Sequence, residues 1–411
     1  MNEYSLGKGD KGMYKAYCRT YQAAMRAGFK LMNWRIPEVM EGENSVLQLP
    51  AIVQSKGVTH VLVVTDVGLA KLGLHEPLLD ALKQVGLQVA IFDKTEPNPT
   101  IYQIEEALSV YHAHHCNGII AFGGGSPIDC AKAVAARVAR PEKTIPQLKG
   151  LFKVRRPIVP LFAVPTTAGT GSEGTVAAVV SNSETHEKYP INDPELIPHI
   201  AVLDPLLTVN LPKHITSTTG MDALTHAVEA YIGHSNTEET RAFSREAVQL
   251  IYDNLYEAYT NGHNVEVRRN MQRASFLAGL AFTRAYVGNV HAIAHTLGGF
   301  YQVPHGLANA VILPHVLRFY GDTVTKPLAE LAQLVGLGTG LDEKGQALAF
   351  IEWIEALNAK MDIPTFIEGI QNRDIPTMAK RALQEANPLY PVPKILNYDE
   401  MFYLYQIIQP K

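Results

Sequence analysis

Hydrophobic positions follow two different patterns along the chain. From about 36 to 205, short apolar runs rich in β-branched residues alternate with amphipathic segments. Such short strands alternating with helices are typical of a parallel sheet covered on both faces, so we expect an α/β domain over 36–209. The predicted helices cover 101–114 and 127–139. The predicted strands are VTHVLVVTD (58–66), LQVAIFD (87–93), NGIIAFGGGS (117–126) and PIVPLFAVPTT (157–167).

The pattern changes after about residue 210. Helical periodicity dominates the second half of the chain, and strand-like runs are few. The change falls in LDPLLTVNLPKH (203–214), which is rich in turn-forming residues. A mainly α-helical domain is therefore predicted over 210–411.

The first 35 residues form a separate segment. Met13, Tyr17, Tyr21 and Met25 recur at roughly helical spacing, which predicts an amphipathic helix over about 11–31. We interpret residues 1–35 as a helical extension packed on its own domain. Its aromatic stripe leaves a contact with another subunit as the alternative.

Composition and charge exclude several classes of protein. The chain has 411 residues, of which 46% are hydrophobic and 18% charged, so intrinsic disorder is excluded as its main state. The 36 Lys and Arg nearly balance the 40 Asp and Glu, which gives no support for a nucleic-acid or anionic-membrane partner. Three widely spaced cysteines make no disulfide framework, the polar start is no secretory signal, and no apolar run reaches the ~18–20 residues of a membrane span. We expect a soluble, cytoplasmic enzyme.

A glycine-rich turn joins the third predicted strand to the helix over 127–139. Gly123, Gly124 and Gly125 allow backbone N–H groups to approach a ligand closely. We expect Ser126 at the N-cap of the helix and Pro127 at its first position, with Asp129 completing a pattern like a capping box. The free N–H groups and positive end of such a helix favour a phosphate, although a purely structural turn is the alternative.

A second loop of small residues, PTTAGTGSEGT (165–175), follows the next strand. Two loops of this kind, each after a strand, predict a dinucleotide site at the carboxyl ends of the strands. The hydroxyls of the second loop belong to Thr166, Thr167, Thr170, Ser172 and Thr175.

Asp66 also ends a predicted strand. A carboxylate at this point can accept both ribose hydroxyls of an adenosine and repels a 2′-phosphate, which favours NAD(H) over NADP(H). The alternative role for Asp66 is the N-cap of a helix.

One carboxylate and several imidazoles lie at helical spacing in the second half. Asp222 and His226 are four residues apart, as are His291 and His295, and His305 follows after a bend. Such groups in an apolar context are costly unless paired or bound to a metal, and they suit Fe²⁺, Zn²⁺, Mn²⁺, Co²⁺ or Ni²⁺. Ala292 stands where a zinc protease has glutamate, which excludes that class.

Five motifs occur in order along the chain: PNPT (97–100), GGGSPIDCAKA (123–133), PTTAGTGSE (165–173), GMDALTHAVEAY (220–231) and VHAIAHTLGGFYQVPHGLANA (290–310). Together they resemble the iron-containing (group III) alcohol dehydrogenase family, over roughly 36–390. The resemblance implies a dehydroquinate synthase-like fold, with a Rossmann-like NAD(P)-binding α/β domain followed by an all-α metal-binding domain.

The resemblance also implies the roles of individual residues. His295 matches a histidine near the nicotinamide that does not bind the metal, and we expect it to relay a proton or orient the substrate. Lys188 matches a basic residue near the ribose, and Asp66 matches the position associated with NAD preference. The metal ligands fall on Asp222, His226, His291 and His305. The residues of the two cofactor loops are Gly124, Gly125, Ser126, Asp129, Thr166, Thr167, Thr170 and Thr175.

The activity that the resemblance implies is hydride transfer between NAD(H) and an alcohol, or the matching aldehyde or ketone. The implied metal is Fe²⁺, with Zn²⁺ or another divalent metal as the alternative. The resemblance also implies a small-molecule substrate and a homo-oligomeric protein, which we expect to be a dimer. Two segments depart from the family: residues before Pro37 lengthen its usual start, and 385–401 departs around an Asn-Pro element that can border the substrate pocket in relatives. Alternatives of lower rank are a 3-dehydroquinate synthase-like lyase, a zinc glycerol dehydrogenase and a non-enzymatic binding protein.

Overall fold

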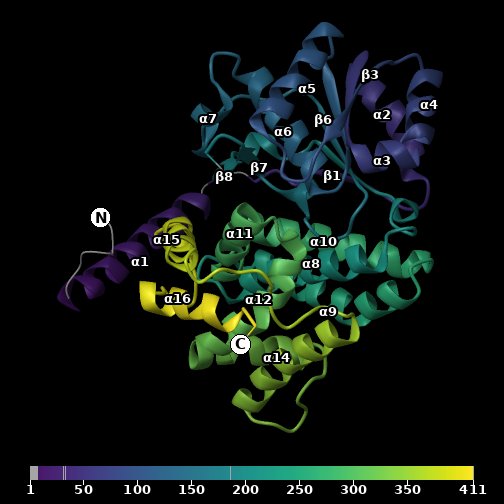
Figure 1. Cartoon of the computed structure of the whole chain (residues 1–411). Helices are drawn as coiled ribbons and strands as arrows, with labels where there is room; N and C mark the ends of the chain where they lie inside the picture. The colour runs from purple at the N-terminus through teal and green to yellow at the C-terminus, as the bar shows by residue number, and fades with distance from the viewer. Residues whose placement is uncertain (1–7, 31, 33, 186, 411) are drawn as a thin grey trace. The chain divides into compact units, whose positions relative to one another are not determined.

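The computed structural model describes residues 8–30, 32, 34–185 and 187–410. The chain forms two compact units (Figure 1). One comprises Trp34–Pro212 with Asn261–Gly279, and the other comprises the described residues of 1–33, Lys213–Thr260 and the described residues of 280–411. The domain limits expected at 35/36 and 209/210 stay predictions.

The first unit contains a six-stranded parallel sheet with the strand order β1-β9-β6-β4-β2-β3. Its strands are β1 (Glu38–Glu41), β2 (His60–Asp66), β3 (Gln88–Thr95), β4 (Gly118–Gly123), β6 (Leu161–Pro165) and β9 (Ile200–Leu203). Its helices are α2 (Leu49–Ser55), α3 (Val67–Leu72), α4 (Glu76–Gln84), α5 (Ile101–Ala113), α6 (Gly125–Ala139) and α7 (Ile145–Leu148).

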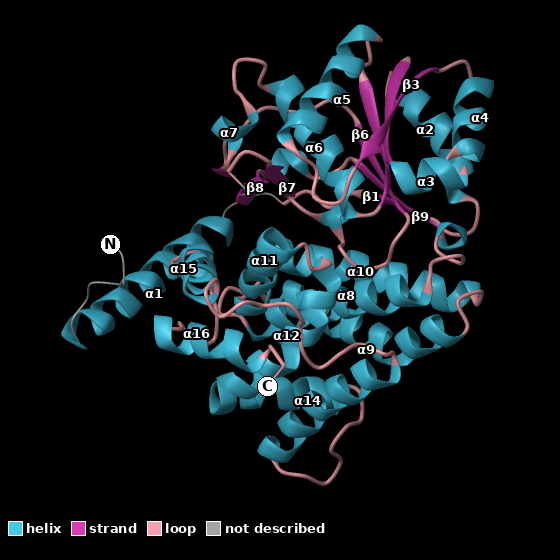
Figure 2. Ribbon diagram, viewed as in Figure 1, coloured by secondary structure: helices cyan, strands magenta, loops and turns pink. Residues whose placement is uncertain are grey.

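The central strand β4 is buried along its whole length because helices cover both faces of the sheet (Figure 2). Ile119 and Ala121 pack in one apolar cluster with α5 and α6. Ile120 and Phe122 point the other way and pack with α2 and α4. Neither face requires a polar side chain, which explains why these strands appear in the sequence as continuous apolar runs. The predicted parallel α/β domain is confirmed.

A second, three-stranded sheet in the order β5-β8-β7 was not predicted. In it β7 (Ala177–Asn182) and β8 (Glu187–Asn192) pair antiparallel, and β5 (Gly150–Leu151) pairs parallel with β8. Burial alternates along β7 and β8 instead of being continuous. Short, half-buried strands of this kind carry a weak hydrophobic signal.

The second unit is helical in its described residues (Figure 2). Its central helix α8 (Lys213–Ile232) is buried at every position from Gly220 to its end, so polar side chains on it require partners inside the protein. Helix α10 (Val265–Ala285) belongs to the first unit up to Gly279 and to the second from Leu280. The other helices are α1 (Lys8–Lys30), α8 (Lys213–Ile232), α9 (Glu238–Thr260), α11 (Asn289–Tyr301), α12 (His305–Tyr320), α13 (Thr325–Leu334), α14 (Glu343–Lys360), α15 (Ile375–Ala386) and α16 (Tyr398–Ile407).

Helix α1 corresponds to the predicted N-terminal helix, but its buried face differs from the predicted stripe. Cys18 and Gln22 are buried, and Tyr21 and Met25 of the predicted stripe are half-buried, whereas Met13 and Tyr17 are 66% and 53% exposed. The buried face therefore combines a small apolar side chain with a polar one, and amphipathic spacing alone could not identify it. None of the helices in the described part of the chain has the length and apolar character needed to cross a membrane.

Candidate metal centre and nucleotide loops

The four predicted metal ligands converge within the helical unit. Helix α8 carries Asp222 and His226, α11 carries His291, and α12 begins with His305. One potential ligand atom from each side chain lies within 4.8 Å of all the others. This spacing suits a single divalent ion, because metal–ligand bonds of ~2.0–2.2 Å place ligand atoms about 3–4 Å apart.

Asn309 shows what three of the four side chains, those of Asp222, His291 and His305, offer where they converge. Its Nδ2 lies 2.6 Å from Oδ1 of Asp222, 3.1 Å from Nε2 of His291 and 3.2 Å from Nε2 of His305. These ligand atoms thus surround a positively polarised N–H group, as they would surround a cation. Oδ1 of Asn309 is buried and has no hydrogen-bond partner in the described residues. The residues present therefore fit a divalent metal ion.

Glu229 is a further residue of the centre, which the sequence analysis did not identify. It is buried on α8, and its carboxylate lies 2.6 Å from Nδ1 of His291. It also accepts hydrogen bonds from the backbone N–H groups of Gly288 and Val290, both at 2.8 Å. A carboxylate on the outer nitrogen of a ligand imidazole fixes its ring orientation. The available signal was spacing, since Glu229 follows Asp222 by seven residues, or two helical turns.

His295 lies beside the centre but outside the group of four. Its ring is stacked on that of His305, with centroids 5.2 Å apart and an interplanar angle of 15°. Its Nδ1 lies 2.6 Å from Oε1 of Glu385, and the hydroxyl of Tyr390 donates to the same oxygen at 2.8 Å. Glu385 and Tyr390 come from the 385–401 segment, and only the tertiary structure brings them to His295.

The glycine turn of the α/β unit differs in detail from the prediction. Helix α6 begins at Gly125 with Gly124 as its N-cap, so Ser126 lies inside the first turn and is not the cap, and Pro127 is the third helical residue instead of the first. The side chain of Ser126 instead accepts from the backbone N–H of Asn98 at 3.2 Å. Asp129 forms no capping box, because the N-cap is a glycine and the half-buried carboxylate of Asp129 accepts from the hydroxyl of Ser172 at 2.9 Å. Burial raises the pKa of Asp129 to about 6.

The two predicted cofactor loops pack directly against each other. A Cβ atom on Gly124 would lie 3.3 Å from Oγ1 of Thr167, and one on Gly125 would lie 2.9 Å from Cγ2 of Thr170. Side chains at these two glycines would push the loops apart. Because neither glycine has a Cβ, the start of α6 can lie close to the second loop (165–175). The prediction of one shared site requires this closeness.

Lys132 is a buried residue of α6 that the sequence analysis overlooked. Its Nζ donates to the carbonyl oxygens of Ser172, Thr175 and Ala177 at 2.6, 2.8 and 2.9 Å. Burial lowers the pKa of Lys132 to about 8, and the nearby Asp129 and Glu173 act in the opposite direction. The ammonium group thus ties α6 to the second loop. The signal in the sequence is a lysine among alanines, in CAKAVAA (130–136).

We expect Lys132→Met to lower the free energy of unfolding by about 3 kcal/mol, because it leaves several buried carbonyl groups without their donor. Thermal denaturation measures the effect. Lys83→Met on α4 is the matched control, since the Lys83 side chain is 60% exposed. A Lys132→Met protein as stable as this control would contradict the anchoring role.

The remaining predicted cofactor residues lie around the same loops. Nζ of Lys188 donates to Oδ1 of Asn98 at 2.6 Å, and Asn98 in turn contacts Ser126. Asp66 is the N-cap of α3, with Oδ1 accepting from the N–H of Leu69 at 2.9 Å. The structure thus shows the capping role that the sequence left as an alternative. Contact of Asp66 with a ribose stays a prediction.

Two family models and several relatives match most of the chain. A model described as "Iron-containing alcohol dehydrogenase" matches residues 37–205, and one described as "Fe-containing alcohol dehydrogenase family, C-terminal" matches 216–408. The 1,3-propanediol dehydrogenase of Klebsiella pneumoniae is 40% identical over 365 residues, which are 87% of this chain and 94% of the relative. The NAD-dependent methanol dehydrogenase of Bacillus methanolicus is 37% identical, over 85% of this chain and 92% of that protein.

Solved structures show the same similarity in three dimensions. The crystal structure of a 1,3-propanediol oxidoreductase superposes with a TM-score of 0.88 at 37% identity, covering 92% of this chain and 99% of that one. The alcohol dehydrogenase from Oenococcus oeni also gives 0.88, at 34% identity and the same coverage.

The parallel α/β unit and the helical unit with its Asp and three His define a class of dehydrogenases with the dehydroquinate synthase-like fold. The chain belongs to the iron-containing alcohol dehydrogenase family. The predicted resemblance, fold class and alcohol dehydrogenase type of activity are confirmed. The roles of individual site residues stay predictions.

Proposed function

We propose that this chain is a metal-dependent dehydrogenase that transfers hydride between a small alcohol or aldehyde and NAD(H). The main support is the convergence of Asp222, His226, His291 and His305 within 4.8 Å, in a chain of the iron-containing alcohol dehydrogenase family. The family match over both parts of the chain favours this function over the lyase and the non-enzymatic alternatives.

The names of the relatives support the substrate class and the cofactor. They are named for 1,3-propanediol, methanol and lactaldehyde, all small oxygen compounds, and one is named as NAD-dependent. The carboxylate of Asp66 supports the preference for NAD(H), because a negative charge near the ribose repels a 2′-phosphate. We infer a short-chain alcohol, diol or hydroxyaldehyde as the substrate.

We propose Fe²⁺ as the native metal, with Zn²⁺ as the alternative. Three imidazoles and one carboxylate, without a thiolate, suit either ion. When bound, the ion would supply a Lewis acid that favours ionisation of an alcohol or polarises a carbonyl. Glu229 orients the ligand imidazole of His291. His295, beside the ligand set and hydrogen-bonded to Glu385, relays a proton or orients the substrate.

In the α/β unit we propose that the loop residues hold the dinucleotide. Backbone N–H groups at Gly125 and Ser126, at the start of α6, suit the pyrophosphate. Asp129 acts through its hydrogen bond to Ser172 and so shapes the second loop, and Lys188 supplies positive charge. The loop residues that we propose for the cofactor are Thr166, Thr167, Thr170 and Thr175, of which Thr175 contributes by shaping the loop, because its hydroxyl is held by Lys132 at 2.9 Å. A homo-oligomeric, dimeric state and a cytoplasmic location stay predictions.

The test is an activity panel on protein stripped of metal and reconstituted separately with Fe²⁺ and Zn²⁺. We expect NADH formation from short alcohols or diols and NADH consumption with the matching aldehydes. We also expect a lower kcat/KM with NADP(H) than with NAD(H). Protein stripped of metal, to which no metal is then added, is the control. Absence of NAD(H)-linked turnover with every alcohol and aldehyde, in protein shown to contain metal, would overturn the proposal.

A further inference from the structure

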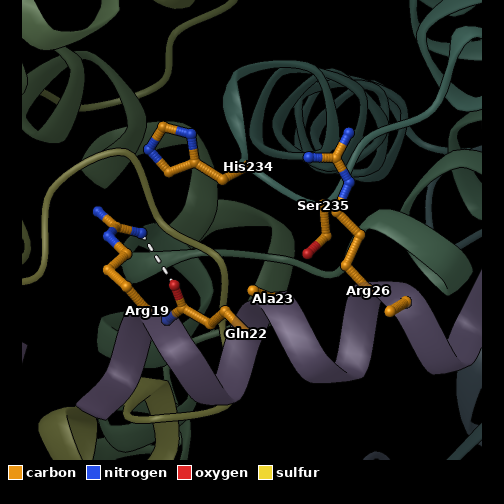
Figure 3. Close-up of a pocket in the computed structure, with 7 residues that line it drawn as sticks. Arg19, Gln22, Ala23, Arg26, His234 and Ser235 are labelled. Atoms are coloured by element: carbon orange, nitrogen blue, oxygen red, sulfur yellow. Dashed lines mark hydrogen bonds between the residues drawn. The ribbon is translucent and has the colours of Figure 1, made fainter. Parts of the chain in front are cut away.

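Helix α1 holds the chain segment 387–393 through two of its side chains. The guanidinium group of Arg19 donates to the carbonyl oxygens of Val392 and Pro393, at 2.7 and 2.9 Å. Nε2 of Gln22 donates to the carbonyl oxygens of Pro388 and Tyr390, at 3.1 and 2.7 Å. Arg19 also donates to Oε1 of Gln22 at 2.9 Å, which orients both side chains (Figure 3).

The segment 387–393 depends on such donors. It has no helix or strand, and Pro388, Pro391 and Pro393 lack the N–H group that would let it pair with a neighbouring strand. Backbone carbonyl groups away from water require hydrogen-bond partners. Two side chains of α1 serve four of these carbonyls, while the backbone N–H of His234 serves that of Pro391 and the N–H of Tyr390 donates to Ala386, both at 2.7 Å. The helix therefore supplies a large share of the hydrogen bonds that fix the path of this segment.

A cavity of about 400 Å³ lies beside these contacts (Figure 3). Its polar lining already serves the protein: Arg19 and Gln22 donate to carbonyl oxygens, and Nε2 of His234 lies 3.3 Å from the carbonyl oxygen of Pro393. These lining side chains therefore support the segment. The cavity is lined by Arg19, Gln22, Ala23, Arg26, Ala27, His234 and Ser235.

From the segment, contacts continue to the histidine beside the metal centre. The hydroxyl of Tyr390 donates to Oε1 of Glu385 at 2.8 Å, and the same oxygen lies 2.6 Å from Nδ1 of His295. Burial raises the pKa of Tyr390 well above its ordinary value, which keeps the hydroxyl protonated as a donor. Nδ1–H of His295 bonded to Glu385 leaves Nε2 as the nitrogen available on the other side of the ring.

A second line of contact joins α1 to Tyr390. Phe29 on α1 stacks on Tyr286 with ring centroids 5.4 Å apart, and Tyr286 lies 6.4 Å from Tyr390. Tyr390 is therefore held at its backbone by Gln22 and at its ring by an aromatic chain that starts on the same helix.

We propose that α1 is a clamp on the active site, in which Arg19 and Gln22 are positioning residues that fix Tyr390, Glu385 and, through them, the imidazole of His295. The inference rests on the proposed function, because positioning of His295 affects catalysis only if the chain is the dehydrogenase proposed above. The segment before Pro37 lies outside the stretch that resembles the family, and 385–401 departs from the family pattern. The clamp thus joins the two segments that distinguish this chain.

The first experiment compares Arg19→Ala and Gln22→Ala with Arg26→Ala in the full-length protein. Arg26 is on the same helix but donates to the carbonyl oxygen of Asn236, outside the clamped segment. We expect faster hydrogen–deuterium exchange in peptides covering 385–397 for the first two variants only. We also expect kcat to fall about tenfold, since sub-ångström misplacement of a reacting group has effects of this order, while metal content and the Kd for NADH are unchanged.

The second experiment tests whether α1 acts through Glu385. In a double-mutant cycle, Arg19→Ala should cost little further kcat in a Glu385→Ala background, because the positioning is already lost. Glu385→Gln should retain most of kcat, since its amide oxygen still accepts from both Tyr390 and His295. Independent, multiplicative losses in the cycle would overturn the proposal, as would unchanged exchange in Arg19→Ala.

The two proposals fail in distinguishable ways. An inactive wild-type protein that contains metal contradicts the proposed function. The hydrogen–deuterium exchange measurement then still tests whether Arg19 and Gln22 order the segment 385–397. An active wild type in which Arg19→Ala is only less stable, with the kcat of Arg26→Ala, contradicts the clamp alone.

Discussion

His305→Ala is expected to abolish metal binding and turnover together. Structural sites with four ligands bind zinc with about 10–16 kcal/mol, so each ligand contributes roughly 2.5–4 kcal/mol. Loss of one imidazole then weakens metal binding by roughly 100- to 1,000-fold. Metal content after desalting, measured by mass spectrometry, and kcat of the same sample should fall in parallel.

The matched control is His315→Ala. His315 is on the same helix, and its Nε2 lies 3.1 Å from the carbonyl oxygen of Thr365, away from the four ligand side chains. This variant should keep its metal and its turnover. Full activity in His305→Ala protein verified to be free of metal would show that the converging side chains are not the catalytic centre.

Glu229→Gln is expected to weaken metal binding by about 10–100-fold, the usual effect of removing a carboxylate that supports a ligand histidine. The carboxylate accepts from three N–H groups, those of His291, Gly288 and Val290. A glutamine has one acceptor oxygen, and its NH₂ group would face another donor, so the buried site also becomes less stable. Chelator competition measures the metal affinity, and thermal denaturation measures the stability.

Glu238→Gln serves as the comparison for this second prediction. Its side chain is 82% exposed at the start of α9, where it pairs with Arg245, and an exposed ion pair of this kind contributes less than about 1 kcal/mol. A Glu229→Gln protein with the metal affinity of Glu238→Gln would remove Glu229 from the metal centre and leave it a purely structural role.

Three of the predicted strands differ in burial from β7 and β8, which the sequence did not predict. The four-residue strands β1 and β9 were also missed, although β9 is fully buried, because each is too short to show a clear pattern. Strands β2, β4 and β6 lie inside the sheet with helices over both faces, so nearly all their residues are apolar and the sequence reveals them. Strands β7 and β8 alternate between buried and half-buried positions, and β8 includes Pro190. Their stability comes from pairing and packing in three dimensions, which leaves little trace in local composition.

The site shows a similar division. Asp222 with His226, and His291 with His295, carry a local signal because helical spacing places each pair on one face. Glu229 carried the same kind of signal and was overlooked. The bond between His295 and Glu385 joins residues 90 positions apart, and no periodicity indicates it.

By itself the sequence determined the order of the apolar strands and helices, the glycine and threonine loops, and the types of side chain that could bind a metal. These features depend on backbone conformation and burial within a few residues of each position. Tertiary structure alone decided which oxygen or N–H group each buried polar side chain meets. Lys132 contacts the second loop, Glu385 contacts His295, and α1 contacts the segment 387–393, because an interior polar group must find its partner wherever packing brings one.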